Sequence, residues 1–336
     1  MGALAICTIR IIGELDSGRL LALLWWPLPT IFHMIETSIL IPTKNGGQEF
    51  EQCLRRVYSQ TGVGPFEVIV IDSGSTDATL EIAAHYPVRI EHIASKDFHH
   101  ARTRNLLSSL AKGDFLVFLS QDAVPANDTW LVSLLDSFND PSIGAAYGRQ
   151  LPKPGATTER HHVFAALYGE SRLVKRPGDG SKLGYKYYHF SSVNAAIRNK
   201  VWQTTRFPED LKVFEDVGIA KRILESGWSI AYEPRAAVYH SHNLTGVDTF
   251  KRYFDIGVIY QRLGIWNKHA GQSVRREGWH AFRNTLTRTL RQDGVSGPGS
   301  LILANIGKYI AVQLGRHERH LPLIVKKKLS LHALFD

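Results

Sequence analysis

The sequence is poor in cysteine and lacks both of the common glycine-rich phosphate loops. Its 336 residues include two cysteines, Cys7 and Cys53. Two are too few for a disulfide framework, which favours a reduced, cytosolic protein. No G-x-G-x-x-G follows the first strand-like run, and no G-x-x-x-x-G-K-[ST] occurs anywhere in the chain. A disulfide-stapled fold is therefore excluded, and neither a dinucleotide cradle nor a P-loop is expected.

Long hydrophobic runs are also scarce. The one stretch that could enter a membrane is Leu20–Phe32, LLALLWWPLPTIF, which contains two prolines and is too short to cross a bilayer. We expect residues 1–36 to be an N-terminal extension. Met34 stands just before the first strand-like run, so residues 1–33 are either an upstream stretch that is not translated in the cell or an interfacial anchor.

The net charge of +9 is placed unevenly. From residue 246 to the end, Lys and Arg outnumber Asp and Glu by nine, so residues 1–245 are neutral overall. A neutral body with a basic tail predicts peripheral contact with an anionic membrane surface. A solvated helical tail is the alternative. Nucleic acid is not expected as a partner, because no recognisable binding motif interleaves these basic residues.

Two apolar runs, Ser38–Thr43 and Phe66–Asp72, each end in a polar loop. Continuous apolar runs of this kind are typical of parallel strands that are buried on both faces. Ligands of such sheets bind just beyond the carboxyl ends of the strands. The residues expected at this edge are Pro42, Thr43, Asn45, Asp72 and Ser75. For Asp72 the alternative to a nucleotide-binding role is the chemistry of a turn and helix cap.

Further strand-like and helical patterns alternate along the chain. In the first helical pattern Phe50, Cys53, Leu54 and Val57 recur at i, i+3, i+4 and i+7 and form one buried stripe. Repeated strand–helix units predict an α/β fold: a Rossmann-like, mostly parallel sheet flanked by helices. We expect this domain to cover residues 37–245 and a basic helical region to cover 246–336. The later strands are expected at Val88–Ala94, Asp114–Ser120, Ile143–Leu151, His189–Asn199 and Ser229–His240.

Three later motifs carry side chains that could bind a metal ion or accept a proton. Asp122 follows an apolar strand, where a carboxylate could hold a divalent cation, although a strand-end Asp is often only a turn residue. Glu215 and Asp216 open a helix, where the helix dipole alone would favour them; an Asp there could also take a proton from a hydroxyl. Val238-Tyr-His-Ser-His242 ends the last strand, and because the chain turns there, only His240 is expected to reach a shared site with Asp122.

Together these motifs resemble one family, the inverting nucleotide-sugar glycosyltransferases of the GT-A fold in glycosyltransferase family two, and its bacterial rhamnosyltransferase-like branch. The resemblance spans roughly Thr37 to the C-terminus. It rests on PTKN at 42–45, DSGSTD at 72–77, FHHARTRN at 98–105, LSQDAVP at 119–125, FEDV at 214–217 and VYHSHN at 238–243.

The resemblance implies roles for individual residues. Asp216 would be the general base and Glu215 would orient the acceptor, while Asp122 and His240 would hold Mg²⁺ or Mn²⁺. Ser-Gln-Asp stands where the family has D-x-D, so the first carboxylate is missing and metal dependence is open. Ser192 and Asn194 would line the acceptor side of the site. Arg104 and His100 would lie near the nucleobase and the phosphates of the donor. The full set expected around the nucleotide sugar is Pro42, Thr43, Asn45, Asp72, Ser75, His100, Arg104, Asn105, Gln121, Asp122, Ser192 and Asn194.

The implied activity is inverting transfer of a sugar, with dTDP-rhamnose the preferred donor by analogy, to a hydroxyl of a lipid-linked or polysaccharide acceptor in cell-envelope synthesis. Two other functions are the alternatives to glycosyl transfer. A catalytically silent nucleotide-sugar-binding or scaffold protein would not need the Glu215–Asp216 pair. A sugar-nucleotide pyrophosphorylase would want a Gly-rich loop with Arg and Lys after the first strand, and KNGGQEF supplies little of it.

Overall fold

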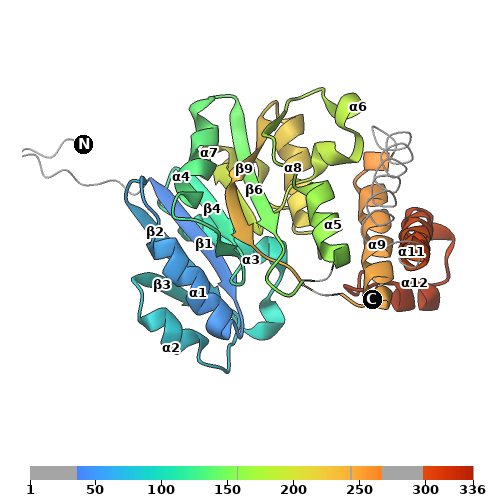
Figure 1. The fold of residues 1–336 in the computed structure, drawn as a ribbon, viewed down its shortest axis with the longest axis horizontal. Helices are drawn as coiled ribbons and strands as arrows, with labels where there is room; N and C mark the ends of the chain where they lie inside the picture. Colours follow the sequence, from blue (N-terminus) through green and yellow to red (C-terminus); the bar gives the residue numbers. More distant parts are fainter. Residues whose placement is uncertain (1–35, 157, 243, 267–297, 336) are drawn as a thin grey trace, which may run out of the picture. The chain divides into compact units, whose positions relative to one another are not determined.

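The computed structural model describes residues 36–156, 158–242, 244–266 and 298–335 (Figure 1). These residues belong to one compact unit. Our expectations for the N-terminal extension, including the apolar stretch Leu20–Phe32, lie outside the described residues.

Four parallel strands form the first half of the sheet, as the sequence predicts. Thr37–Thr43 lies between its two partners, and its register places Thr43 opposite Asp72, so both loops open at the same edge. Alternate side chains of this strand serve two different cores: Ile39 and Ile41 pack on one face and Leu40 on the other. The strands are β1 (Thr37–Thr43), β2 (Phe66–Asp72), β3 (Val88–His92) and β4 (Phe115–Leu119).

The second half of the sheet is mixed, in contrast to the mostly parallel sheet that we expected. The nine described strands follow the order β3-β2-β1-β4-β8-β6-β9-β5, with β7 paired to β9. Strand β8 runs antiparallel to both of its neighbours, and the two short strands run antiparallel to β9, whereas β6 and β9 are parallel. The remaining strands are β5 (Val124–Pro125), β6 (Ile143–Leu151), β7 (Leu173–Lys175), β8 (Asn194–Arg198) and β9 (Ser229–Tyr239).

Helices cover both faces of this sheet (Figure 1). Phe50 and Leu54 of the first helix pack with Ile39, whereas Ala101 and Ile219 from two other helices pack with Leu40. The described helices of this part are α1 (Gly47–Tyr58), α2 (Thr79–Ala84), α3 (His100–Leu110), α4 (Trp130–Leu135), α5 (Thr158–Leu167), α6 (Gly180–Leu183), α7 (Asn199–Thr205) and α8 (Glu215–Glu225). Four-residue or shorter turns of 3₁₀ helix lie at Ser95–Asp97 and Asp136–Asn139, and a longer one at Gly184–Tyr188.

Helices make up most of the described chain after residue 245. A close helix crossing holds α9 (Gly246–Arg262) against α11 (Pro298–Arg316). A Cβ on Gly257 would lie 2.4 Å from the carbonyl oxygen of Val312, and one on Gly315 would lie 2.1 Å from that of Phe254. The crossing therefore requires glycine on both helices. A 3₁₀ turn at Glu318–His320 and helix α12 (Leu323–Leu329) follow.

A buried carboxylate on α9 binds the end of the described chain, and we call this contact the clasp. Asp255, which is fully buried, accepts hydrogen bonds from the backbone N–H groups of Leu331 (3.0 Å) and His332 (3.1 Å) and contacts Nδ1 of His332 at 2.8 Å. The His332 ring meets the ring of Phe214 edge-on at 6.2 Å between centroids. Phe214 is the left-handed residue (φ 58°) that precedes Glu215, so this clasp reaches the start of α8.

Candidate active site

The loops after β1 and β2 are tied to each other and to the loop after β4. The Thr43 hydroxyl donates to Oε1 of Gln121, which also accepts from the N–H of Lys44 at 2.9 Å, and Gln121 Nε2 donates to the Lys44 carbonyl at 3.0 Å. Asn45 adopts a left-handed conformation (φ 47°), and its N–H donates to the Ser75 hydroxyl at 2.8 Å. Thr43, Asn45, Ser75 and Gln121 therefore share one edge, as the sequence predicts.

Asp72 is held by its own turn. Its carboxylate accepts from the N–H of Gly74 at 2.9 Å and from both the N–H and the hydroxyl of Ser75, and the residue is 2 % exposed. Burial raises its pKa, but these hydrogen bonds outweigh that effect and hold the pKa of Asp72 below its usual range. Asp72 thus carries a negative charge at the sheet edge, while Pro42 is the half-buried residue that precedes Thr43.

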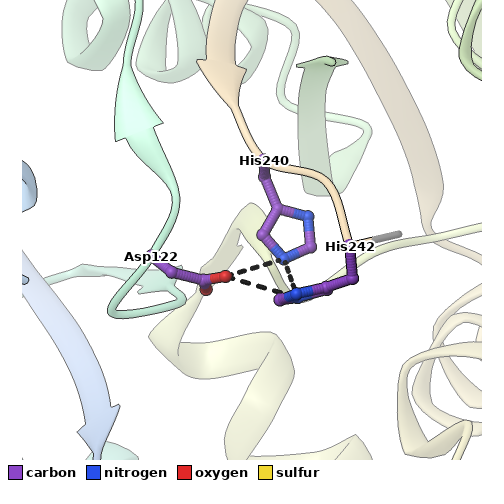
Figure 2. A group of neighbouring side chains, drawn as sticks. All are labelled: Asp122, His240 and His242. Atoms are coloured by element: carbon purple, nitrogen blue, oxygen red, sulfur yellow. Dashed lines mark hydrogen bonds and ion pairs between the residues drawn. The ribbon is translucent and has the colours of Figure 1, made fainter. Parts of the chain in front are cut away.

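Asp122, His240 and His242 converge on one point (Figure 2). Oδ2 of Asp122 lies 3.6 Å from Nε2 of His240 and 3.3 Å from Nε2 of His242, and the two imidazole nitrogens are 3.2 Å apart. The pairing of β5 with β9 causes this convergence, because it aligns Val124 with Tyr239. Our expectation that only His240 would reach Asp122 is wrong: the turn after β9 brings His242 to the same carboxylate oxygen.

The environment of His240 suits a metal ligand. Its Nδ1 lies 2.9 Å from Oε1 of Gln150, whose Nε2 donates to the hydroxyls of Tyr168 (2.7 Å) and Ser191 (2.8 Å). With the proton on Nδ1, the lone pair of Nε2 points to Asp122. Burial lowers the pKa of His240 to about 4 despite the neighbouring Asp122, so the ring is neutral at pH 7. One carboxylate and two imidazoles whose donor atoms all lie within 4.8 Å could hold a divalent ion.

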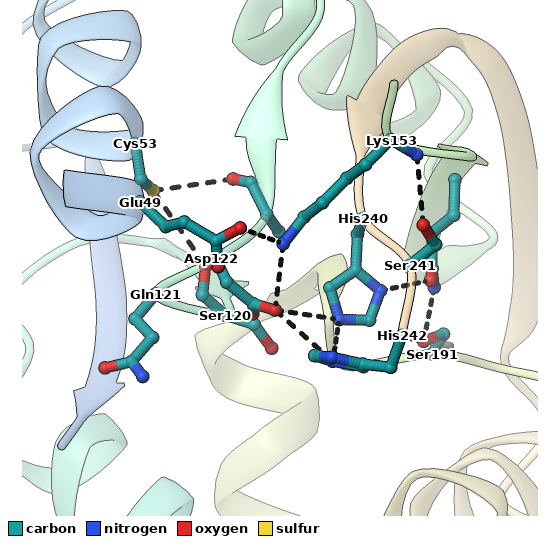
Figure 3. A network of polar contacts seen from close by, with 12 residues as sticks. Glu49, Cys53, Ser120, Gln121, Asp122, Lys153, Ser191, His240, Ser241 and His242 are labelled. Atoms are coloured by element: carbon teal, nitrogen blue, oxygen red, sulfur yellow. Dashed lines mark hydrogen bonds and ion pairs between the residues drawn. The ribbon is translucent and has the colours of Figure 1, made fainter. Parts of the chain in front are cut away.

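Lys153, which the sequence analysis did not single out, also reaches Asp122 (Figure 3). Its Nζ lies 2.8 Å from Oε1 of Glu49 and 3.4 Å from Oδ2 of Asp122, and its backbone N–H donates to the Ser241 hydroxyl at 3.0 Å. The residue follows the end of β6, so the strand-end rule that pointed to Asp122 could have pointed to Lys153 as well.

The two acidic residues that open α8 have different surroundings. Glu215 forms a buried ion pair with Arg104, with 2.5 Å between Oε1 and Nη1, and each side chain is 7 % exposed. His100 Nδ1 lies 3.5 Å from the same guanidinium, and burial lowers the pKa of His100. The structure thus brings together Glu215, Arg104 and His100.

Asp216 is the partly buried carboxylate of this pair. Burial, together with the charge of Glu215, raises the pKa of Asp216 to about 7, against the opposing charges of Arg104 and Arg252. Arg252, on α9, also acts on Tyr168 and His240, and Asp216 itself raises the pKa of buried Tyr168. Tyr168 and Gln150 therefore connect the surroundings of Asp216 with those of His240. A carboxylate that titrates near neutrality is suited to general base catalysis.

Three residues expected around the ligands are buried in the protein. Asn105 uses its amide on Trp202 and Phe207, and the fully buried Asn194 uses its amide on Trp130 and the carbonyl oxygen of Ala236. Because protein groups occupy both amides, the structure gives them a supporting role instead of the predicted contact with a ligand. Ser192 lies beside them in sequence and is 3 % exposed.

Known proteins resemble this chain in sequence and in fold. The O-antigen chain rhamnosyltransferase RfbN of Salmonella typhimurium is 34% identical over 304 residues, which is 90% of this chain and 96% of that protein. The O-antigen chain rhamnosyltransferase WbaN of Salmonella anatum is 34% identical over 301 residues, 89% of this chain and 95% of that protein.

Solved structures share the GT-A fold. The mannosyltransferase PcManGT of Pyrobaculum calidifontis, in complex with GDP-Man and Mn²⁺, superimposes with a TM-score of 0.57 at 16% identity, covering 85% of this chain and 88% of that one. Residues 38–205 match the model of the family described as glycosyl transferase family 2. With relatives of this similarity along most of its length and a family model that matches half of it, the chain belongs to glycosyl transferase family 2 and is a glycosyltransferase.

Proposed function

We propose that this protein is an inverting rhamnosyltransferase that moves rhamnose from dTDP-rhamnose to a hydroxyl of a lipid-linked glycan during synthesis of a cell-envelope polysaccharide. The observation that carries the proposal is its 34% identity, over 90% of the chain, to an O-antigen chain rhamnosyltransferase. Asp122 and the Glu215–Asp216 pair favour an enzyme over the silent binding protein, because a binding module has no use for a buried base.

Asp216 acts as the base in this proposal. It takes the proton of the acceptor hydroxyl, whose oxygen attacks the anomeric carbon from the face opposite the nucleoside diphosphate. The bond from that carbon to the diphosphate oxygen breaks, and positive charge develops on the sugar as in glycoside hydrolysis. A pKa of about 7 leaves Asp216 ionised in a useful fraction at neutral pH and still basic enough to accept the proton.

The donor is held between the loops after β1 and β2. Thr43 and Asp72 face the nucleoside in this proposal, with Asn45, Ser75 and Gln121 fixing the two loops. The contacts that support the pocket are already made between the loops, such as Asn45 Oδ1 accepting from the N–H of Thr76 at 2.8 Å. A site built this way loses little conformational entropy when the nucleotide binds.

Asp122, His240 and His242 would hold a divalent ion. The ion would neutralise charge on the departing diphosphate. Mn²⁺ is the ion that we propose, since two imidazoles with one carboxylate suit it better than Mg²⁺, which prefers oxygen ligands.

We also propose that helices α11 and α12 contact an anionic membrane surface at the cytoplasmic face of the inner membrane. No helix in the described part of the chain is both long and apolar enough to cross a bilayer. In α12, exposed Leu323 and Ile324 directly precede the basic run Lys326–Lys328, which is the combination that interfacial binding uses, and further large apolar side chains are exposed on α11. These exposed residues are Ile306, Tyr309, Ile310, Leu323 and Ile324.

A donor screen tests the activity. Purified protein is incubated with dTDP-rhamnose, UDP-glucose, UDP-GlcNAc or GDP-mannose and a polyprenyl diphosphate-linked glycan, with Mn²⁺, Mg²⁺ or chelator, and nucleoside diphosphate release is measured. We expect release from dTDP-rhamnose, with Mn²⁺ the more effective ion, and a product whose anomeric configuration is inverted by NMR. If no donor is turned over and none protects the protein from thermal unfolding, the enzyme assignment fails.

Vesicle sedimentation tests the membrane contact. The wild type should sediment with vesicles containing phosphatidylglycerol and should stay in solution with phosphatidylcholine alone. Replacing Lys326, Lys327 and Lys328 by Gln should weaken sedimentation by one to two orders of magnitude, at about 1 kcal/mol per cation. Ile324→Asp should also weaken it, because Ile324 is 71 % exposed. Equal sedimentation with both lipids would contradict the proposal.

A further inference from the structure

Lys153 places a positive charge beside two carboxylates of the candidate site. Its ammonium reaches Asp122 (3.4 Å) and Glu49 (2.8 Å) together, and its side chain is 19 % exposed (Figure 3). Its backbone is fixed by the hydrogen bond to Ser241, in the segment that carries His240 and His242. The loop after β6 is thereby tied to the histidines at the edge where β4 ends.

The ammonium and a divalent ion would compete for one atom. Lys153 approaches Oδ2 of Asp122, and the same oxygen faces Nε2 of His240 and of His242. Like charges this close repel strongly at the effective dielectric constant of a protein surface, and the second charge of a divalent ion doubles the repulsion. An ion held by Asp122 therefore requires the ammonium to leave that oxygen.

Once a divalent ion binds Asp122, only weak interactions hold the Lys153 ammonium in its position. Glu49 is 56 % exposed, and an exposed ion pair contributes about 0–1 kcal/mol. Four rotatable bonds allow the ammonium to turn toward a new anion without movement of the loop. The anion that arrives together with the ion, under the function proposed above, is the diphosphate of the nucleotide sugar.

We propose that Lys153 is an exchangeable cation of the active site, which neutralises Asp122 in the empty enzyme and binds the leaving diphosphate when a divalent ion takes Asp122. This inference rests on the proposed function. As the bond from the anomeric carbon to the β-phosphate oxygen breaks, its electron pair stays on that oxygen and Lys153 balances the added charge. The acceptor proton passes to Asp216, and Lys153 transfers no proton in this step.

Opposite shifts in two affinities test the exchange. Lys153→Met keeps the apolar stem and removes the charge, Lys153→Arg keeps the charge, and Lys182→Met is the matched control, because Lys182 forms a 3.7 Å ion pair with Asp179 and is 80 % exposed. Binding of Mn²⁺ alone is measured by electron paramagnetic resonance. Binding of dTDP, UDP and GDP, each with Mn²⁺, is measured by calorimetry.

We expect Lys153→Met to bind Mn²⁺ alone about tenfold more tightly than the wild type and to bind dTDP with Mn²⁺ about tenfold more weakly. Lys153→Arg should bind dTDP nearly as the wild type does, and Lys182→Met should change neither affinity. A merely structural role would weaken both affinities, since damage to the loop would disturb all three metal ligands.

Several results would overturn the proposal. Mn²⁺ binding no tighter in Lys153→Met than in the wild type, including no binding by either, would refute the competition. Undiminished binding of all three nucleoside diphosphates would refute the phosphate contact. Neither measurement needs transfer of a sugar, so failure of the donor screen and failure of the exchange are separate outcomes.

Discussion

The pH dependence of sugar transfer tests Asp216 as the base. Burial and, to a smaller extent, the negative charge of Glu215 together raise the pKa of Asp216 to about 7. With that pKa, about one tenth of the enzyme carries an ionised base at pH 6 and about nine tenths at pH 8. We therefore expect kcat/KM to rise about ninefold between these pH values, whereas an exposed aspartate would give a flat profile over this range.

Substitutions separate the base from its neighbour. Asp216→Asn should lower kcat by about 10²–10⁴-fold. Glu215→Gln removes the charge that raises the pKa of Asp216 and leaves Arg104 to lower it, so the acidic limb of the profile should move to lower pH. The raised pKa also costs stability, fully so above pH 7 and progressively less toward pH 4. Asp216→Asn should therefore melt at a higher temperature than the wild type at pH 8, and the difference should shrink at pH 5.

The assay is initial-rate release of nucleoside diphosphate over a range of acceptor concentrations from pH 5.5 to 9, which gives both kcat and kcat/KM, with calorimetric melting on the same samples. Lys182→Met, far from the base, serves as the control and should reproduce the wild-type profile. Wild-type rates in Asp216→Asn would refute the role of Asp216. An acidic limb that Glu215→Gln leaves in place would refute the electrostatic origin of its pKa.

Three further predictions concern other parts of the molecule. Gly315→Ala should lower the free energy of unfolding by about 1–3 kcal/mol in urea titrations, because its Cβ would lie 2.1 Å from the carbonyl oxygen of Phe254. Burial holds the pKa of Lys175 well below its usual value, so folding disfavours its charged form; Lys175→Met should raise the melting temperature at pH 7 and less at pH 10. His242→Ala should weaken Mn²⁺ binding at least about tenfold by paramagnetic resonance, and unchanged binding would remove His242 from the metal site.

Local patterns in the sequence predict the first half of the fold well. Strand β2 has the expected bounds and β1 begins one residue early, because strands buried on both faces are apolar without interruption. The expected strand His189–Asn199 is shorter, Asn194–Arg198, since Phe190 is buried from a loop and not from the sheet. The direction of β8 depends on pairing with β4 and β6, distant in sequence, so local pattern does not contain it.

The site was predictable where a strand end carries a charged or polar group of recognisable type. Asp122 and His240 meet as expected, whereas His242 depends on the path of a turn that alternation along a strand does not describe. Lys153 also follows the end of a strand, but only the three-dimensional structure shows that its ammonium reaches Asp122 and Glu49. Asn105 lies within a familiar motif, but a motif does not reveal that Trp202 and Phe207 use its amide.

The clasp between Asp255 and residues 331–332 has a consequence for biosynthesis. The start of α8, which carries Asp216, touches His332 through Phe214, yet His332 is made long after the sheet is complete. During synthesis domains generally fold as units. Because the described residues form one compact unit, the contact that supports the start of α8, and with it the proposed base Asp216, can form only after residue 332 has left the ribosome.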